Sequence, residues 1–179
     1  MALPLPEQQR TGLTPLLVKC AEAAPGFAWV PPGNLHLTLR FLGRVEPGPL
    51  AELGVRLAAI PAEPVHLALG ALGTFGGRRR ARVVWLGLRE GQEALAALAT
   101  EVEAACRASG LAPEVRPFRA HLTLGRSRAR GGAHLPEQEL LPDPLQPPDW
   151  VAGSLVLFES HLDRPAARYE PVMEFPLRG

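Results

Sequence analysis

The tetrapeptide His-Leu-Thr-Leu occurs twice in the chain, at His36–Leu39 and again at His121–Leu124. The chain contains five histidines, so two identical contexts of this kind are very improbable by chance. Each copy lies in an alternating run that is typical of a β-strand, over residues 35–42 and 118–125. Each of these strands follows a segment with helical periodicity, which indicates an internal duplication of a helix–strand unit.

The alternation of a strand determines where the side chains of each copy point. Residues two apart share a face, so His36 and Thr38 point one way while the leucines beside them point to the core. His121 and Thr123 repeat this arrangement. We therefore expect the two His/Thr faces to meet across a groove, related by a pseudo-two-fold axis, with both imidazoles close enough to bracket one phosphate.

The other elements follow in an irregular order. Helices are predicted over 7–24, 49–60 and 93–109, and further strands over 65–69, 82–88, 151–159 and 168–175. A loop rich in proline, glycine and arginine occupies residues 127–148. Because strands and helices do not alternate regularly, the sequence predicts an α+β fold, with antiparallel sheets and helices packed on one face of each.

Length and composition restrict the class of protein. The 179 residues favour one domain, and 46% apolar residues suffice for a substantial core. No uninterrupted apolar stretch reaches eighteen residues, and the N-terminus lacks a basic segment followed by an apolar run. These features argue against a membrane-spanning helix and a signal peptide. Cys20 and Cys106 are interpreted as reduced thiols of a cytoplasmic protein.

The net charge of +1 conceals a strong preference for one basic residue. Eighteen of the nineteen basic residues are arginines, and Lys19 is the one lysine. Two explanations of this composition stay open: codon bias in a GC-rich genome, and a preference for arginine as a phosphate ligand. Lys19 lies in a predicted helix with no surrounding motif, which argues against ligation through a covalent lysyl-adenylate.

The repeated motif suits phosphodiester cleavage without a metal. One imidazole can take a proton from an attacking water while the other gives a proton to a leaving oxygen. The threonine hydroxyls are short donors for phosphate oxygens. The sequence contains no clustered metal ligands, phosphate-binding glycine loop or serine nucleophile motif, so we expect neither a metal nor a cofactor.

The two His-x-Thr-x motifs resemble those of the 2H phosphoesterase superfamily. The flanking segments make the resemblance more specific, and it covers nearly the whole chain: Asn34–Leu39 with Phe41–Gly43, Arg82–Gly87, Pro117–Leu124 with Arg126, and Leu157–Ser160 with Arg168–Glu170. Together they are similar to the bacterial and archaeal RNA 2′,3′-cyclic phosphodiesterases, also called 2′-5′ RNA ligases.

This resemblance implies both a fold and an activity. It implies one domain of two lobes over residues 1–179, each lobe an antiparallel sheet with helices on its outer face and one His-x-Thr strand, with the active cleft between the lobes. It implies hydrolysis of an RNA 2′,3′-cyclic phosphate to a 2′-phosphate, with reversible 2′-5′ ligation as a further family activity. It gives His121 the role of base and His36 that of acid. We expect a cytoplasmic monomer that acts on RNA ends or cyclic-phosphate nucleotides, with no membrane or protein partner.

Several arginines are candidates for binding the substrate. Arg126 matches an arginine common in the family, and a bulge or the end of the strand at Gly125 would bring it to the His/Thr face as a phosphate ligand. Strand parity places Arg40 on the face of His36, where it either binds substrate or is a surface residue. The basic run at 78–82 either tracks an RNA backbone or is a solvated loop.

Two points stay open at this stage. Family members open with a strand of the form Arg-Leu-Phe-x-Ala, and Ala2–Pro6 matches only its end, so the first strand is expected to be truncated or missing.

The alternative functions are a 2H phosphodiesterase acting on cyclic nucleotides or 2′-5′ oligonucleotides, and an RNA-end binding module. The intact His/Thr pairs argue against the binding module, since binding alone needs no paired acid and base.

Overall fold

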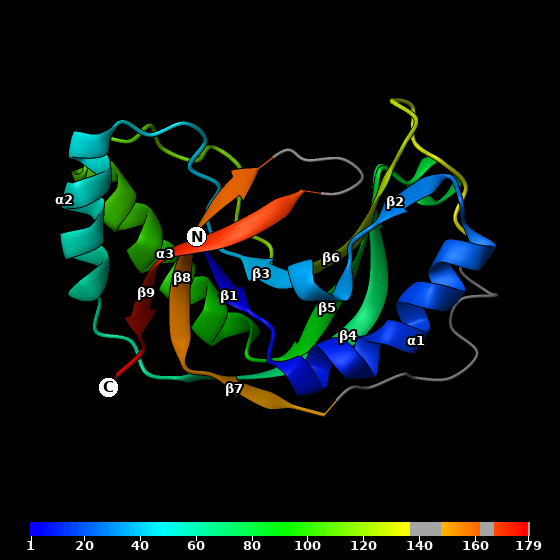
Figure 1. Cartoon of the computed structure of the whole chain (residues 1–179), viewed down its shortest axis with the longest axis horizontal. Helices are drawn as coiled ribbons and strands as arrows, with labels where there is room; N and C mark the ends of the chain where they lie inside the picture. The colour runs from blue at the N-terminus through cyan, green and yellow to red at the C-terminus, as the bar shows by residue number, and fades with distance from the viewer. Residues whose placement is uncertain (137–147, 162–166, 179) are drawn as a thin grey trace.

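Figure 1 shows the computed structural model of the chain, which describes residues 1–136, 148–161 and 167–178, without the side chain of Arg78. Its helices are α1 (Glu7–Ala23), η1 (Pro32–Asn34), α2 (Pro47–Ala58), η2 (Arg78–Arg80) and α3 (Gln92–Ala108). Its strands are β1 (Ala2–Pro4), β2 (Phe27–Trp29), β3 (His36–Thr38), β4 (Val65–Phe75), β5 (Val83–Glu90), β6 (Leu122–Ser127), β7 (Trp150–Ala152), β8 (Ser154–His161) and β9 (Arg168–Pro176). Part of the predicted loop at 127–148 lies outside the described residues.

The long helices form where the sequence predicts them. The buried side chains of α3 recur three and four residues apart, which is the pattern of an amphipathic helix; they are Leu95, Leu98, Ala99, Val102, Ala105 and Cys106. Gly110 follows α3 with a φ of 81°, and the Leu111 N–H donates to the Cys106 carbonyl. This is the glycine stop that the sequence predicts, because glycine adopts the left-handed conformation without steric cost.

The described strands form one continuous antiparallel sheet. Its order is β7-β4-β5-β6-β3-β1-β8-β9, and β2 pairs with β6. Because β5 takes one edge of β6, β2 and β3 share the other edge at successive places. Helices α2 and α3 lie together at one end of the molecule and α1 at the other (Figure 1). An antiparallel sheet with segregated helices confirms the predicted α+β class.

The two motif strands are direct neighbours at the centre of this sheet. Strands β1 and β3, separated by α1, form one adjacent pair, and β5 and β6, separated by α3, form another. The order β5-β6-β3-β1 therefore places both motif strands on the inside. Two lobes related by a pseudo-two-fold axis stay a prediction.

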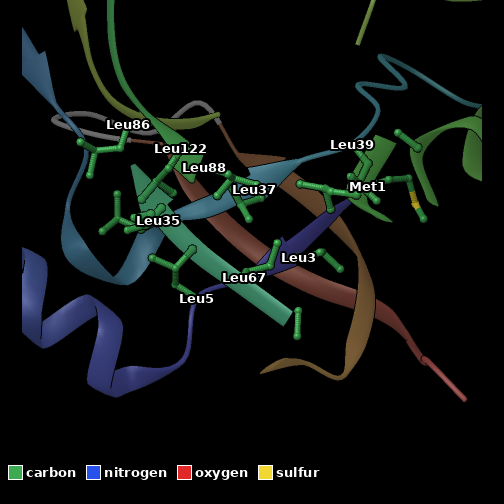
Figure 2. Close-up of a cluster of buried hydrophobic side chains, with 14 of the residues drawn as sticks. Met1, Leu3, Leu5, Leu35, Leu37, Leu39, Leu67, Leu86, Leu88 and Leu122 are labelled. Carbon is green, nitrogen blue, oxygen red and sulfur yellow. The ribbon is translucent and has the colours of Figure 1, made fainter. Parts of the chain in front are cut away.

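The leucines of both motifs face the core, as the alternation predicts. Leu37 and Leu122 are opposite each other in the register and are almost fully buried. Figure 2 shows them with leucines from β1, β4 and β5 in one apolar cluster. A slip of one residue would expose these leucines and bury the histidines, so the hydrophobic pattern holds the register of β3 against β6.

Several strands differ from the sequence prediction. Strand β6 begins at Leu122 rather than at 118, β4 continues to Phe75, and the strand predicted over 151–159 is divided at Gly153 into β7 and β8. The first strand is present as β1 between β3 and β8, so the alternative in which it is missing is wrong. Strand β2 was not predicted. Strand β3 ends at Thr38 rather than at 42, because the N–H groups of Leu39 and Arg40 both donate to the Met1 carbonyl instead of continuing a ladder. In the described part of the chain, no helix is long and apolar enough to cross a membrane.

Candidate active site

The sheet brings both His/Thr pairs together on one face. Because Leu37 lies opposite Leu122 in an antiparallel pair, His36 lies opposite Thr123, and Thr38 lies opposite His121. Directly opposed residues share a face, and this face is the one away from the leucine core. The histidines are diagonal neighbours, a relation in which Cβ atoms are typically about 7–8 Å apart. The two pairs lie side by side on adjacent strands of one sheet.

Each imidazole is held at the same nitrogen in the same way. The Nδ1 atom of His36 lies 2.8 Å from the carbonyl oxygen of Asn34, and Nδ1 of His121 lies 2.7 Å from that of Arg119. A carbonyl oxygen only accepts, so Nδ1 must carry the proton in both rings. The Nε2 atom is therefore the nitrogen that exchanges a proton: it is a base when the ring is neutral and an acid when it is charged.

Aromatic rings flank each imidazole. His36 contacts Tyr169 with a centroid separation of 4.9 Å and Phe158 at 6.0 Å. On the other side of the site, His121 lies 5.1 Å from Phe75 and 6.2 Å from the Trp85 ring. These ring contacts restrict the orientation of each imidazole.

None of these four rings was among the candidate site residues predicted from the sequence. Phe158, Tyr169 and Trp85 belong to flanking segments that resemble the family, which was the signal available for them, whereas Phe75 lies outside every segment used for the resemblance. Trp85 lies opposite Thr123 on the His/Thr face, and its ring covers Gly73 of β4.

The surroundings of His36 change its protonation. Burial is the largest effect and lowers the pKa of His36 below its ordinary value, because the protein solvates the imidazolium less well than water. The hydrogen bond to the Asn34 carbonyl opposes this shift, and nearby positive charge, including that of Arg126, adds to it. His36 is consequently neutral over more of the pH range than a free imidazole is.

A bulge in β6 brings Arg126 to the site. Trp85 is paired with Thr123, but Val84 is paired with Gly125 and Val83 with Arg126, so Leu124 is an extra residue in β6. This insertion inverts the alternation beyond Thr123 and turns the exposed Arg126 to the face of the His/Thr pairs. The geometry is the one that the sequence-based expectation of a bulge at Gly125 required.

Arg40 is held away from the motif residues. Its Nε atom forms an ion pair with Glu103 at 2.7 Å, and its Nη2 atom donates to the Ala112 carbonyl at 2.5 Å. Glu114 is a second carboxylate partner at 3.5 Å. Because these groups take up the guanidinium, the structure gives no support to the expected substrate-binding role. Arg40 instead connects the end of the first motif to α3 and to the segment before His121.

Two groups of residues in the described part of the chain have the composition of metal ligands. One consists of His66, Glu90 and Asp149, and the other of Glu159, His161 and Glu170. Neither group includes a residue of the His/Thr pairs. The second lies on the β8–β9 hairpin, where strand alternation turns Glu159 and Glu170 to the face opposite Phe158 and Tyr169.

Two imidazoles with available Nε2 atoms, two hydroxyls and a guanidinium on one sheet face define a phosphoesterase of the two-histidine class. A family model described as LigT like Phosphoesterase matches the chain twice, over residues 3–85 and 86–169, and each match contains one His-Leu-Thr-Leu. The chain belongs to this LigT-like phosphoesterase family.

Individual relatives carry a more specific name. The RNA 2′,3′-cyclic phosphodiesterase of Geobacillus stearothermophilus is 33% identical over 181 residues, which are 100% of this chain and 57% of that protein. The protein of the same name from Thermus thermophilus is 32% identical over 98% of this chain and 87% of its own length. This chain thus spans little more than half of the first relative and most of the second.

The solved structures agree with the family. Escherichia coli LigT in complex with 3′-AMP matches with a TM-score of 0.80 and 28% identity, covering 99% of this chain and 96% of LigT. The same protein has been crystallised with ATP and with NADP+.

Proposed function

We propose that this protein hydrolyses the 2′,3′-cyclic phosphate at an RNA end to a 2′-phosphate, by acid–base catalysis between His36 and His121. The observation that carries the proposal is the pair of imidazoles on one face, each with Nδ1 committed to a carbonyl and Nε2 available. The names of the relatives support the substrate, and the bound 3′-AMP of E. coli LigT supports a ribonucleotide ligand.

The reaction needs one proton removed and one supplied. Water attacks phosphorus, one neutral imidazole takes its proton at Nε2, and the bond from phosphorus to O3′ breaks. The other imidazole, charged at the start, gives its Nε2 proton to the departing O3′. The reaction leaves a 2′-phosphate, and the two imidazoles together hold as many protons after it as before. Thr38, Thr123 and Arg126 are the donors for the phosphate oxygens, where negative charge develops.

The resemblance to the family gives His121 the role of base and His36 the role of acid. The lowered pKa of His36 means that the free protein holds this ring mainly neutral near pH 7. A bound phosphate diester is negatively charged and raises the pKa of a neighbouring imidazole. Substrate binding thus favours the protonated form of His36, which is the form that can act as the acid.

A related activity uses the same groups with a 5′-hydroxyl in place of water. Ligation of a 2′-5′ bond is the attack of a 5′-hydroxyl on the cyclic phosphate, with the same transfer of protons and no lysyl-adenylate. A second candidate substrate is a free cyclic nucleotide or a 2′-5′ oligonucleotide, which the mononucleotide and dinucleotide complexes of E. coli LigT favour.

We further propose that the protein works as a monomer in the cytoplasm. Both motifs come from one chain, so the site needs no residue from a second copy, and the buried thiols of Cys20 and Cys106 suit a reducing compartment. Light scattering at micromolar concentration should give the mass of a single chain.

The test follows both the rate and the position of the phosphate. Purified protein is incubated with an oligoribonucleotide that ends in a 2′,3′-cyclic phosphate, and ³¹P NMR distinguishes the 2′-phosphate from the 3′-phosphate. The expected product is the 2′-phosphate. A product with a 3′-phosphate, or no reaction with this RNA or a free 2′,3′-cyclic nucleotide, would show that the proposed function is wrong.

A further inference from the structure

A cluster of exposed arginines lies at the end of the strands that carry the second motif. We call it the arginine patch; its members are Arg79, Arg80, Arg82, Arg128 and Arg130. Arg79 and Arg80 belong to η2, Arg82 directly precedes β5, and the other two follow β6. Backbone contacts join these segments, since Ala81 pairs with Ala133 and the Ser127 N–H donates to the Arg82 carbonyl at 2.9 Å. In Figure 1, η2 lies beside the yellow segment that follows β6.

The arginine patch has no compensating negative charge within its own segments. Residues 64–89 and 115–136 contain no aspartate or glutamate. Arg89 and Arg116, which stand in the same two stretches, form ion pairs with acids of other segments: Arg89 with Glu90 and Asp149, and Arg116 with Glu114. In the described part of the chain, no member of the patch has a carboxylate partner. Like charges gathered without partners create a positive potential that attracts a polyanion.

The patch is continuous with the candidate active site. Phe75 contacts the His121 ring, and the chain passes from it through two glycines directly into η2. Arg126 lies on the site face, opposite Val83, and Arg82 precedes that valine. Three residues of strand span about 10 Å, so Arg82 lies roughly that far along the chain from Trp85. A strand of nucleic acid with its end between the histidines therefore reaches the patch with its next phosphates.

The opposite side of the site has the opposite charge. Strands β8 and β9 flank His36 and carry Glu159, Glu170 and Glu174 in their described residues. Their arginine, Arg168, forms an ion pair with Glu170. The described residues of this hairpin therefore offer a polyanion no excess of positive charge, and a polyanion that leaves the site is attracted to the side of β4, β5 and β6.

From this asymmetry we propose that the arginine patch binds the phosphates of the nucleotides upstream of the cyclic phosphate. The substrate class is then an RNA chain several nucleotides long, and a free cyclic mononucleotide is a poor substitute that fills only the site itself. This inference rests on the proposed function, because it describes where the rest of that substrate lies.

The test compares two substrates and two matched variants. The substrates are an oligoribonucleotide with a 2′,3′-cyclic phosphate end and a 2′,3′-cyclic mononucleotide, each at 50 and 200 mM salt. The patch variant is Arg79→Gln, Arg80→Gln and Arg82→Gln combined. The control variant combines Arg44→Gln, Arg56→Gln and Arg107→Gln, three exposed arginines outside the patch, and makes the same change in net charge. Circular dichroism checks that both variants are folded.

For the patch variant we expect kcat/KM on the RNA to fall roughly 10- to 100-fold at low salt, and kcat/KM on the mononucleotide to stay within about twofold. Each lost phosphate contact should also flatten the log–log salt dependence by about 0.7. The control variant should match the wild type. If the patch variant retains its activity on RNA, or loses equal activity on both substrates, the inference is wrong. If the wild type hydrolyses neither substrate, the proposed function has failed instead.

Discussion

At the scale of single residues, the hydrogen bond at Nδ1 fixes the tautomer and the orientation of each imidazole. A histidine with both nitrogens free exchanges tautomers and rotates, so its reactive nitrogen is poorly placed. Here the carbonyls of Asn34 and Arg119 hold the proton on Nδ1, and the adjacent aromatic rings restrict rotation. Both effects place Nε2 before substrate arrives, and an orientation prepared in this way lowers the activation barrier.

Removing either imidazole should nearly abolish turnover. We expect His36→Ala and His121→Ala each to lower kcat on cyclic-phosphate RNA by about 10²–10⁴-fold, the usual contribution of one positioned acid or base. The double variant should lose less than the product of the two, because the rings act as a unit. Thr38→Ala and Thr123→Ala should have milder effects. Steady-state kinetics measure all five variants, and wild-type turnover in either single histidine variant would exclude the paired mechanism.

The lowered pKa of His36 has consequences for titration and for stability. NMR should place its pKa in the free protein below about 6.5. The unfolded chain then binds more protons than the folded one between these two pKa values, so the free energy of unfolding should fall as the pH drops through that window.

Urea unfolding at several pH values measures this effect, with His36→Asn as the comparison. Asparagine keeps an N–H donor for the Asn34 carbonyl but does not titrate, so the variant should have a weaker dependence of stability on pH below 6.5. An equal dependence in both proteins, or an NMR pKa of His36 at or above 6.5, would contradict the prediction.

At the scale of elements, the bulge in β6 decides which arginine faces the site. Gly125 is part of that bulge, and a Cβ added there would lie 2.6 Å from the Trp29 ring, closer than real contacts allow. We expect Gly125→Ala to destabilise the fold by about 1–3 kcal/mol, as overpacking of a filled core does, and to lower activity by displacing Arg126.

Urea titration measures that loss, and Gly153→Ala is the control. Gly153 has no atom within 4 Å of an added Cβ, so this change should alter stability by less than about 0.5 kcal/mol. Trp29→Leu replaces the ring with a smaller side chain, so it should recover part of the stability that Gly125→Ala loses. Equal stability of the two alanine variants would show that β6 accommodates the extra carbon.

Arg40 joins two elements, and its substitution distinguishes that role from substrate binding. Its side chain is only 10% exposed, and its carboxylate partner Glu103 is 26% exposed. Removing one partner of such a pair should cost about 1–3 kcal/mol of stability, less than for a fully buried pair. Arg40→Met should also lower kcat, because the segment before His121 loses its anchor at Ala112.

Calorimetry and steady-state kinetics together decide between the two roles of Arg40. The anchoring role predicts lower thermal stability with KM within about twofold of the wild-type value. A raised KM with unchanged stability would instead support the substrate-binding role.

What the sequence could predict at this scale depends on the length of each element. The three long helices carry enough periodic positions to be located within about two residues at each end. Strands β1 and β2 have three residues each, too few for an alternation to be recognised. Strand β4 extends beyond its predicted end. Gly70 and Gly73 interrupt its apolar pattern, so the sequence did not indicate that the strand continues. The bulge was expected only from Gly125 and the family arginine, and no pattern within β5 indicated it.

At the scale of the whole molecule, the pairing of β3 with β6 creates the site. Alternation predicts which side of each strand carries histidine and threonine, but it cannot predict which strand lies beside which. That choice is made by the leucine face, since only this register buries Leu37 against Leu122 and the surrounding cluster (Figure 2). The arrangement of the His/Thr pairs is thus a consequence of core packing on the reverse side of the sheet.

The distribution of charged groups over the molecule also predicts metal-independent catalysis. In the proposed mechanism the imidazoles transfer the protons, and Arg126 and the arginine patch balance the charge of the phosphates. The metal-like groups in the described residues are separate from the His/Thr pairs: one is built around His66, and the other lies on the reverse face of the β8–β9 hairpin. Turnover on cyclic-phosphate RNA should therefore be unchanged, within about twofold, after dialysis against EDTA.

Substitutions in the metal-like groups provide the matched control for chelation. Glu159→Gln and Glu170→Gln remove two carboxylates from the hairpin group while preserving its hydrogen-bonding shape, and turnover should again be retained. Because these carboxylates lie on the reverse face of the hairpin, their removal should leave turnover within about twofold of the wild-type value. Complete loss of activity in EDTA, restored by adding one divalent ion, would place the protein in a metal-dependent class and overturn the two-histidine mechanism.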